Sequence, residues 1–299
     1  MIIKKRVKNN TWIMLSIAGL FMLFFTGTLL HAGAKGVNQQ LKKAIQRGNI
    51  ESAKELVKEG ADLDWHDSNG KTHLIYAIEN NDLKMAALLL ENGADANSQH
   101  LAMGTPLHMV AIGGNIEIVN LLLKHGARVN ERNHNNETPL HHAASAGMTE
   151  TVKLLVEKGA DPNIKGTDSG QTPLHLIALS GNTGAAKILL DKGADISARD
   201  NQGQTPLHKA ALHGKTETAK LLIDQGANVN ARDKHYGQTP LHLIALSGST
   251  ETAELLIEKG ADVNAVDEDG LTPLQKAVRR GYTKIKNLLI KSGAKDEGN

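Results

Sequence analysis

The chain has 299 residues, with 34 Lys and Arg against 32 Asp and Glu, no Cys, and 3% aromatic residues. The lack of Cys excludes disulfides, thiolate metal sites and cysteine nucleophiles, and the near balance of charge removes the electrostatic basis for nucleic-acid binding. Hydrophobic residues still make up 40% of the chain. An interior of Leu, Ile, Val and Ala indicates many small packing units rather than one thick core.

The first 34 residues have the composition of an export signal. Met1–Asn10 carries four basic residues and no acidic one, Thr11–Leu30 has no charge, and His31–Ala34 ends in small residues. This pattern predicts a signal peptide, residues 1–34, that is cut after Ala34. The uncharged stretch is also long enough for a transmembrane helix, so a retained signal anchor is the alternative. Both interpretations place the rest of the chain outside the cytoplasm.

The leader also fixes the expected location of the protein. If the chain is cut we expect it in the periplasm or secreted, and a bacterial source fits the small residues before Lys35. If it is not cut, Thr11–Leu30 anchors it in a membrane with the remainder outside the cytoplasm. The sequence leaves the source open, because Asn136-Glu137-Thr138 would be a glycosylation sequon in a eukaryotic protein.

After Lys35 the chain repeats itself every 33 or 34 residues. A Gly begins the turn at the end of each unit, and a Thr-Pro-Leu-His string or a degenerate copy begins the next. The glycines are Gly60, Gly93, Gly126, Gly159, Gly193, Gly226, Gly260 and Gly293. The units start near residues 39, 72, 105, 138, 172, 205, 239 and 272. A fixed period of this length is typical of a solenoid.

The unit from Thr105 shows how each repeat should fold. Thr105 can cap a helix, and Pro106 fits its first position, where no N–H is needed. We expect this short helix to stop at Gly113 and a second helix to follow over Ile116–His125. A polar stretch then crosses to the next Thr. Neither helix is long enough to be stable alone, so stacked units must supply the packing.

The Thr-Pro-Leu-His string at this period resembles the ankyrin repeat, over residues 37–295, with a short tail at 296–299. The resemblance implies an all-α solenoid of about eight repeats, in which helix-turn-helix units carry β-hairpin-like fingers and form a concave face. It also implies that the motif histidines His108, His141, His175, His208 and His242 bridge neighbouring fingers. They are therefore expected to be structural, and we expect no catalytic residue, no cofactor and no metal site. The first unit replaces the string with Gln-Gln-Leu-Lys and the last is rich in Lys and Arg, as end caps should be.

Residues that differ between repeats are the candidates for binding a partner. They occupy the finger tips or the position after the motif His, and large or apolar side chains among them could anchor an interface. The candidates are Tyr76, Leu101, Met103, His134, Lys165, Arg199, Arg232, His235 and Tyr236. Met103 and Asn136 replace a tip Gly, which predicts distorted fingers. The stretches Gly159–Thr172 and Gly226–Thr239 are one residue longer than the others, which predicts two bulged fingers.

The expected function is a non-catalytic, exported scaffold that binds another protein through the concave face. The alternative is a membrane-tethered structural spacer with an uncleaved N-terminal helix. We expect a protein partner of unknown identity, no nucleic acid, membrane contact only through the N-terminal segment, and a monomer.

Overall fold

The computed structural model describes residues 36–166 and 168–295. These residues form two compact units, which divide between Asp95 and Ala96. The predicted leader 1–34 and the tail 296–299 lie outside the described residues. Among the described helices, none has the length and apolar character needed to cross a lipid bilayer.

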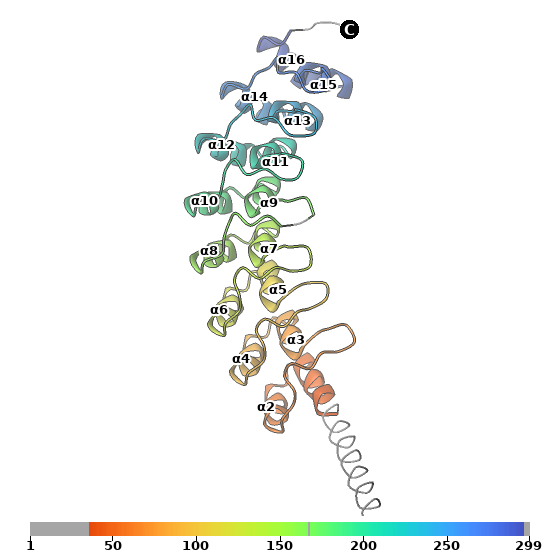
Figure 1. Ribbon diagram of the computed structural model, residues 1–299, viewed down its shortest axis with the longest axis vertical. Helices are drawn as coiled ribbons and strands as arrows, with labels where there is room; N and C mark the ends of the chain where they lie inside the picture. Colours follow the sequence, from red (N-terminus) through yellow and green to blue (C-terminus); the bar gives the residue numbers. More distant parts are fainter. Residues whose placement is uncertain (1–35, 167, 296–299) are drawn as a thin grey trace, which may run out of the picture. The chain divides into compact units, whose positions relative to one another are not determined.

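The first compact unit contains the two repeats that begin with Gln-Gln-Leu-Lys and Thr-His-Leu-Ile instead of Thr-Pro-Leu-His. It consists of a helix over residues 36–46 followed by α2 (Ile50–Lys58), α3 (His73–Glu79) and α4 (Leu83–Glu91) (Figure 1). Helix α4 packs against both α2 and α3. Although His73 replaces the usual Pro, Thr72 still caps α3, because its hydroxyl accepts a hydrogen bond from the Ile75 N–H at 3.4 Å.

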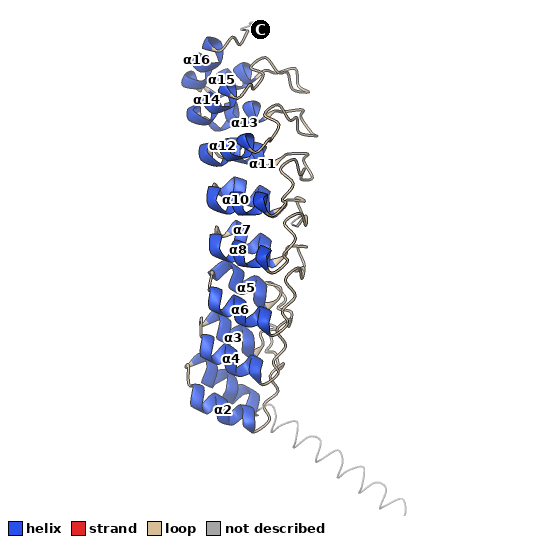
Figure 2. Ribbon diagram, turned by 90° about the vertical axis from the view of Figure 1, so that its left-hand side faces the viewer, coloured by secondary structure: helices blue, strands red, loops and turns tan. Residues whose placement is uncertain are grey.

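The second unit is a stack of helix pairs. The first helices of the pairs are α5 (Pro106–Gly113), α7 (Pro139–Ser145), α9 (Pro173–Ser180), α11 (Pro206–Leu212), α13 (Pro240–Ser247) and α15 (Pro273–Arg280). The second helices are α6 (Ile116–Lys124), α8 (Thr149–Glu157), α10 (Thr183–Asp191), α12 (Thr216–Asp224), α14 (Thr250–Glu258) and α16 (Thr283–Lys291). First helices pack on first helices, and second on second. The loops that join successive pairs, here called fingers, project on one side of the helices (Figure 2).

The local sequence explains where each first helix begins. Thr105 has extended backbone angles, Pro106 occupies the first helical turn, and the side chains of Thr105 and His108 form a capping box. The second helices end two residues before a Gly, such as Gly126, whose φ of 83° is left-handed. This conformation is open to Gly without a steric cost.

The core consists of thin layers between repeats. Leu107 of the repeat string and Leu122 of the second helix are both fully buried, and Ala111 fills the space between neighbouring first helices. The same three positions are buried in the following repeats up to α13–α14. The fingers carry isolated antiparallel bridges, among them His100 with Gly104. The predicted all-α solenoid is therefore confirmed.

Candidate protein-binding surface

The motif histidines join each repeat to the next finger. The Nδ1 of His208 accepts a hydrogen bond from the Thr205 N–H at 3.1 Å, and its Nε2 donates to the carbonyl oxygen of Gln238 at 3.1 Å. Because a backbone N–H can only donate and a carbonyl can only accept, the ring must be neutral with its proton on Nε2. The same contact joins His108 to Glu137, His141 to Gln171, His175 to Gln204 and His242 to Leu271, at 2.9–3.2 Å. The bridging role implied by the repeat string is confirmed.

Burial keeps these rings uncharged. Desolvation lowers the pKa of His108, His141 and His208 to about 4, and the carbonyl partner on Nε2 offsets only part of that effect. The pKa values of His175 and His242 are also lowered, again mainly by burial. At neutral pH these imidazoles are therefore structural hydrogen-bonding groups.

Tyr76 does not lie where a partner anchor was expected. Its side chain is only 8% exposed, and its hydroxyl donates to Asp67. The ammonium group of Lys42 lies 3.0 Å from Asp67 and 4.6 Å from the centre of the Tyr76 ring. Burial disfavours the charged form of Asp67, but the hydrogen bonds from Tyr76 and Lys42 prevail and lower its pKa. The Tyr76 side chain therefore packs and bonds within the first compact unit.

The position after the motif His has an internal partner in other repeats as well. Lys209 contacts Asp200 at 2.8 Å, and the carboxylate side chain is only 1% exposed. Lys276 contacts Asp267 in the same way at 2.6 Å, and the hydrogen bond from Lys276 lowers the pKa of Asp267 despite its burial. In these repeats the residue at this position pairs with an acid of the preceding finger, which the sequence interpretation missed.

Most finger-tip candidates are exposed. Leu101 is 79% exposed and Tyr236 is 56% exposed, so both large side chains are accessible to a partner. The other exposed candidates are His134, Lys165, Arg199, Arg232 and His235, whereas Met103 is half-buried.

The arginine candidates also hold the fingers together. Arg199 Nη1 donates to the carbonyl oxygen of Gly203 at 2.7 Å and to that of Arg232, in the next finger, at 2.8 Å. Arg232 Nη2 in turn donates to the carbonyl oxygen of Val266. These guanidinium groups therefore have a structural role, although their side chains face solvent.

Backbone hydrogen bonds link the tips of four successive fingers. The N–H groups of Asn201, Lys234 and Glu268 donate to the carbonyl oxygens of Ser169, Gln202 and Tyr236, respectively, each at 2.8 Å. Tyr236 is therefore an exposed side chain on a tip whose backbone is fixed by its neighbour.

The two fingers that lack a tip Gly differ in their conformation. Asn136 adopts the left-handed conformation itself, with φ of 59°, and its N–H donates to Asn133 at 2.9 Å, as Gly203 does to Asp200. The prediction of a distorted finger is wrong there, since Asn tolerates this conformation. In the Met103 finger the left-handed residue is Gly104, one position later. That finger closes through His100, whose Nδ1 accepts the Met103 N–H at 3.2 Å.

Each finger is closed by a backbone hydrogen bond, and in the two longer fingers the extra residue lies between the two residues that form it. Asp200 N–H pairs with the carbonyl oxygen of Gln204, four residues later, whereas Asp233 pairs with Gln238, five residues later. Gly166 pairs with Gln171 with the same wider spacing. The predicted bulges are confirmed.

A second link between repeats was not predicted from the sequence. Asn163 donates from Nδ2 to the carbonyl oxygen of Gly193 at 2.9 Å and accepts the Asp195 N–H on Oδ1 at 2.7 Å. The same pair of bonds is made by Asn97, Asn130, Asn230 and Asn264. In the sequence each of these Asn residues lies four positions after the Gly that begins the turn. Ser197 occupies the corresponding position after Gly193 and bonds with Asp195 instead.

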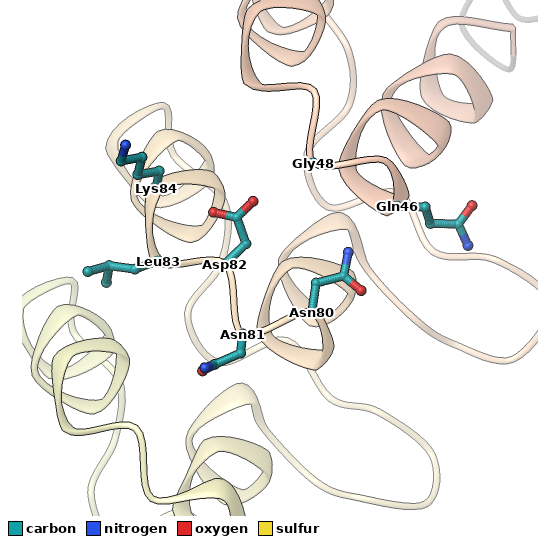
Figure 3. A pocket seen from close by; sticks show the side chains of 7 residues that line it. All are labelled: Gln46, Gly48, Asn80, Asn81, Asp82, Leu83 and Lys84. Carbon is teal, nitrogen blue, oxygen red and sulfur yellow. The ribbon is translucent and has the colours of Figure 1, made fainter.

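The pockets of the described surface include the following two. The larger, of about 590 Å³, belongs to the first unit and is lined by the helix turns around Gly48 and Asp82. Figure 3 shows Asn81, Lys84 and Leu83 pointing away from Gly48, so few side chains converge there. The second, of about 340 Å³, lies between α5 and α7 and is lined by Ile112, Glu137, His141, His142, Ser145 and Ala146. In the described part of the chain no group of three or more His, Asp or Glu is placed to hold a metal ion.

The geometry defines a helical solenoid whose repeats are joined by buried histidines and by finger contacts. A family model for ankyrin repeats matches residues 28–100, 99–166, 164–233 and 232–297. The chain therefore belongs to the ankyrin-repeat family. A search of the curated proteins finds no match. Ankyrin repeats generally mediate protein–protein interaction and are typically non-catalytic.

Proposed function

We propose that this chain is a non-catalytic scaffold that binds another protein through the first helices and fingers of the second unit. We call this the inner surface. The observation that supports it best is the exposure of Leu101 and Tyr236, because the loop of Leu101 is closed by the His100–Gly104 hydrogen bonds and the tip of Tyr236 is bonded to the next finger. Exposed apolar groups on a rigid frame can bind with little loss of conformational entropy.

The first helices extend this surface. Ile112 and Leu179 occupy equivalent positions near the ends of α5 and α9, and both are exposed. The corresponding Leu212 and Leu246 are half-buried. Ile112 also lines the 340 Å³ pocket, together with Glu137. A partner with apolar side chains and one polar group fits such a lining.

A pull-down with matched variants tests the inner surface. The chain is immobilised, exposed to envelope and host-cell extracts, and the bound proteins are quantified by mass spectrometry. The double variant Leu101→Ala/Tyr236→Ala should lose the specific partner. The control variant Lys124→Ala/Lys153→Ala, on exposed positions of the second helices, should retain it. If the finger variant captures every partner as the unchanged chain does, the inner surface is not the binding site.

We also propose that the array acts outside the cytoplasm, on the basis of the basic and apolar N-terminal sequence. Mass spectrometry of the mature chain distinguishes the two forms of this proposal. A first residue of Lys35 supports an exported, cleaved protein. A chain that still contains Thr11–Leu30 and sediments with membranes supports the tethered spacer, because the uncharged stretch is long enough to span a bilayer.

A further inference from the structure

The last repeat has a charge unlike that of the other repeats. Residues 273–291, which form α15, α16 and the turn between them, contain basic residues and no acidic one. The basic residues are Lys276, Arg279, Arg280, Lys284, Lys286 and Lys291. Lys276 is buried against Asp267. Within residues 36–166 and 168–295, none of the other five has a carboxylate within ion-pair distance.

Part of this surface is the face on which another repeat would stack. Val278 occupies the position that Ala245 occupies in α13, where the side chain is fully buried by the next repeat. Lys286 occupies the position of the buried Ala253 in α14. In α15 and α16 the side chains of Val278 and Ile290 are exposed. A polar end face is needed for solubility, but that need does not decide the sign of its charge.

The sign of the charge at α16 opposes the local helix electrostatics. The second position of α6, α8, α12 and α14 is Glu117, Glu150, Glu217 and Glu251, which the positive end of the helix dipole favours. In α16 this position is Lys284, and no acidic residue lies in the first turn. A cation there is unfavourable for the helix, so capping and solubility alone would be better served by Glu. Neither the helix dipole nor solubility therefore explains the choice of Lys at this position.

We propose that the last repeat is a second docking surface, which binds an acidic segment of a protein partner. Arg279 and Arg280 can hold carboxylates with paired hydrogen bonds, and Lys284 and Lys286 add positive charge beside them. The exposed Val278 and Ile290 give the segment an apolar contact. An anionic lipid surface is less well matched, because interfacial anchors are typically aromatic and Tyr282 is half-buried, with its hydroxyl on the Leu246 carbonyl oxygen.

The test is a binding titration on the full chain in neutral detergent. The probe is a fluorescein-labelled peptide that alternates Glu with Leu and Ser, and the matched peptide has Gln in place of every Glu. We expect the acidic peptide to bind, the Gln peptide not to bind, and the affinity to fall with added salt. Lys284→Glu/Lys286→Glu should weaken binding of the acidic peptide roughly tenfold or more, with an equal or higher melting temperature. The second measurement separates lost binding from lost folding.

A control variant and a lipid assay complete the design. Lys124→Glu/Lys153→Glu makes the same change in net charge at exposed positions on α6 and α8, and should change the affinity less than about twofold. Equal losses in the two variants, or no binding of the acidic peptide, would overturn the proposal. So would binding to phosphatidylglycerol vesicles that depends on Lys284 and Lys286 while the peptide fails to bind. Lys284 and Lys286 lie on α16, which is a second helix and so outside the inner surface. The outcome of the peptide titration therefore does not decide whether Leu101 and Tyr236 bind a partner.

Discussion

The Nε2 of His208 lies 3.1 Å from the carbonyl oxygen of Gln238, so a single neutral imidazole joins the first helix of one repeat to the next finger. Its Nδ1 already accepts the Thr205 N–H at 3.1 Å. A proton on Nδ1 would face this donor and break the capping box. The stability of the array is therefore linked to the protonation of its motif histidines.

The first prediction is that stability falls in mild acid. The pKa of His108, His141 and His208 is about 4 in the folded chain and about 6.5 when unfolded. Between these values the unfolded chain binds more protons, so the stabilising contribution is complete above pH 6.5 and is lost as the pH falls toward 4. We expect a loss of up to roughly 1.4 kcal/mol per pH unit for each histidine.

Urea unfolding between pH 7 and pH 4.5 measures this slope. The variant His208→Gln is the matched control, because Gln275 makes the same capping box in α15, with its Oε1 2.9 Å from the Thr272 N–H. Gln does not titrate, so this variant should have a shallower pH dependence than the unchanged chain. Identical slopes would show that His208 is not held neutral.

A second prediction concerns the broken Asn row. Ser197 bonds only with Asp195, within its own turn, in the described structure. Ser197→Asn should restore the two bonds to the next repeat that Asn163 makes, to a Gly carbonyl oxygen and a backbone N–H. Because the site is exposed, we expect a gain of only about 1 kcal/mol in the free energy of unfolding. The reverse change, Asn163→Ser, should lower the urea midpoint; no shift in either variant contradicts the argument.

A third prediction tests the buried ion pair. Lys209→Leu leaves the Asp200 carboxylate buried without its cation, which should cost about 3 kcal/mol in unfolding free energy. Adding Asp200→Asn should recover most of this loss. Asn133 shows that Asn can hold the same turn, since its Oδ1 accepts the N–H groups of Asn135 and Glu137. Equal stability of the single and double variants, measured by urea unfolding, would mean that the charge of Asp200 is not the cause.

A fourth prediction separates Tyr76 from the exposed candidates. Tyr76→Phe removes a hydroxyl from the half-buried, charged Asp67, so it should destabilise the chain by about 1.5–3 kcal/mol. Leu101→Ala and Tyr236→Ala should each change stability by less than about 0.5 kcal/mol, because these side chains are exposed. Thermal melts of the three variants provide the comparison. A large destabilisation by either tip variant would indicate a structural role for that tip.

A fifth prediction concerns the charge in the first turn of α16. Lys284→Glu should raise the free energy of unfolding by about 0.3–1 kcal/mol, because Glu interacts favourably with the positive end of the helix dipole. Lys284→Gln should have an intermediate effect. Urea unfolding at low salt measures both changes, and a loss of stability in the Glu variant would remove the argument that Lys284 opposes the helix.

The repeat frame was predictable because it rests on local chemistry. Thr105, Pro106 and Gly126 act through backbone conformation and capping within their own segments, and the sequence spacing carries that information directly. The binding candidates were harder to judge. Tyr76 and Lys209 vary as finger-tip residues do, yet each is paired with an acid nine residues earlier, in the finger that precedes its helix. Whether a variable side chain turns toward solvent or toward Asp depends on the folded finger, and a spacing rule does not give this.

The contacts between Arg199 and Arg232 and between Asn163 and Gly193 were missed for a related reason. They run from a side chain to the backbone of the next repeat, so only one partner leaves a trace in the residue pattern. Asn136 and Met103 show a second limit of prediction from sequence, because residues at the same position of the repeat fold differently. Both occupy the place of a tip Gly, but one adopts a left-handed backbone and the other transfers that conformation to Gly104. Residue type at a single position did not distinguish the two outcomes.

The bridging His and Asn side chains also bear on how the chain assembles. Their hydrogen bonds to the next repeat in the second unit join residues 29 to 32 positions apart. Folding therefore needs little loop closure at any stage, and each layer can form as soon as the following repeat is present. A chain that emerges from a narrow pore one end first can complete its layers in order, and its distant end need not have appeared.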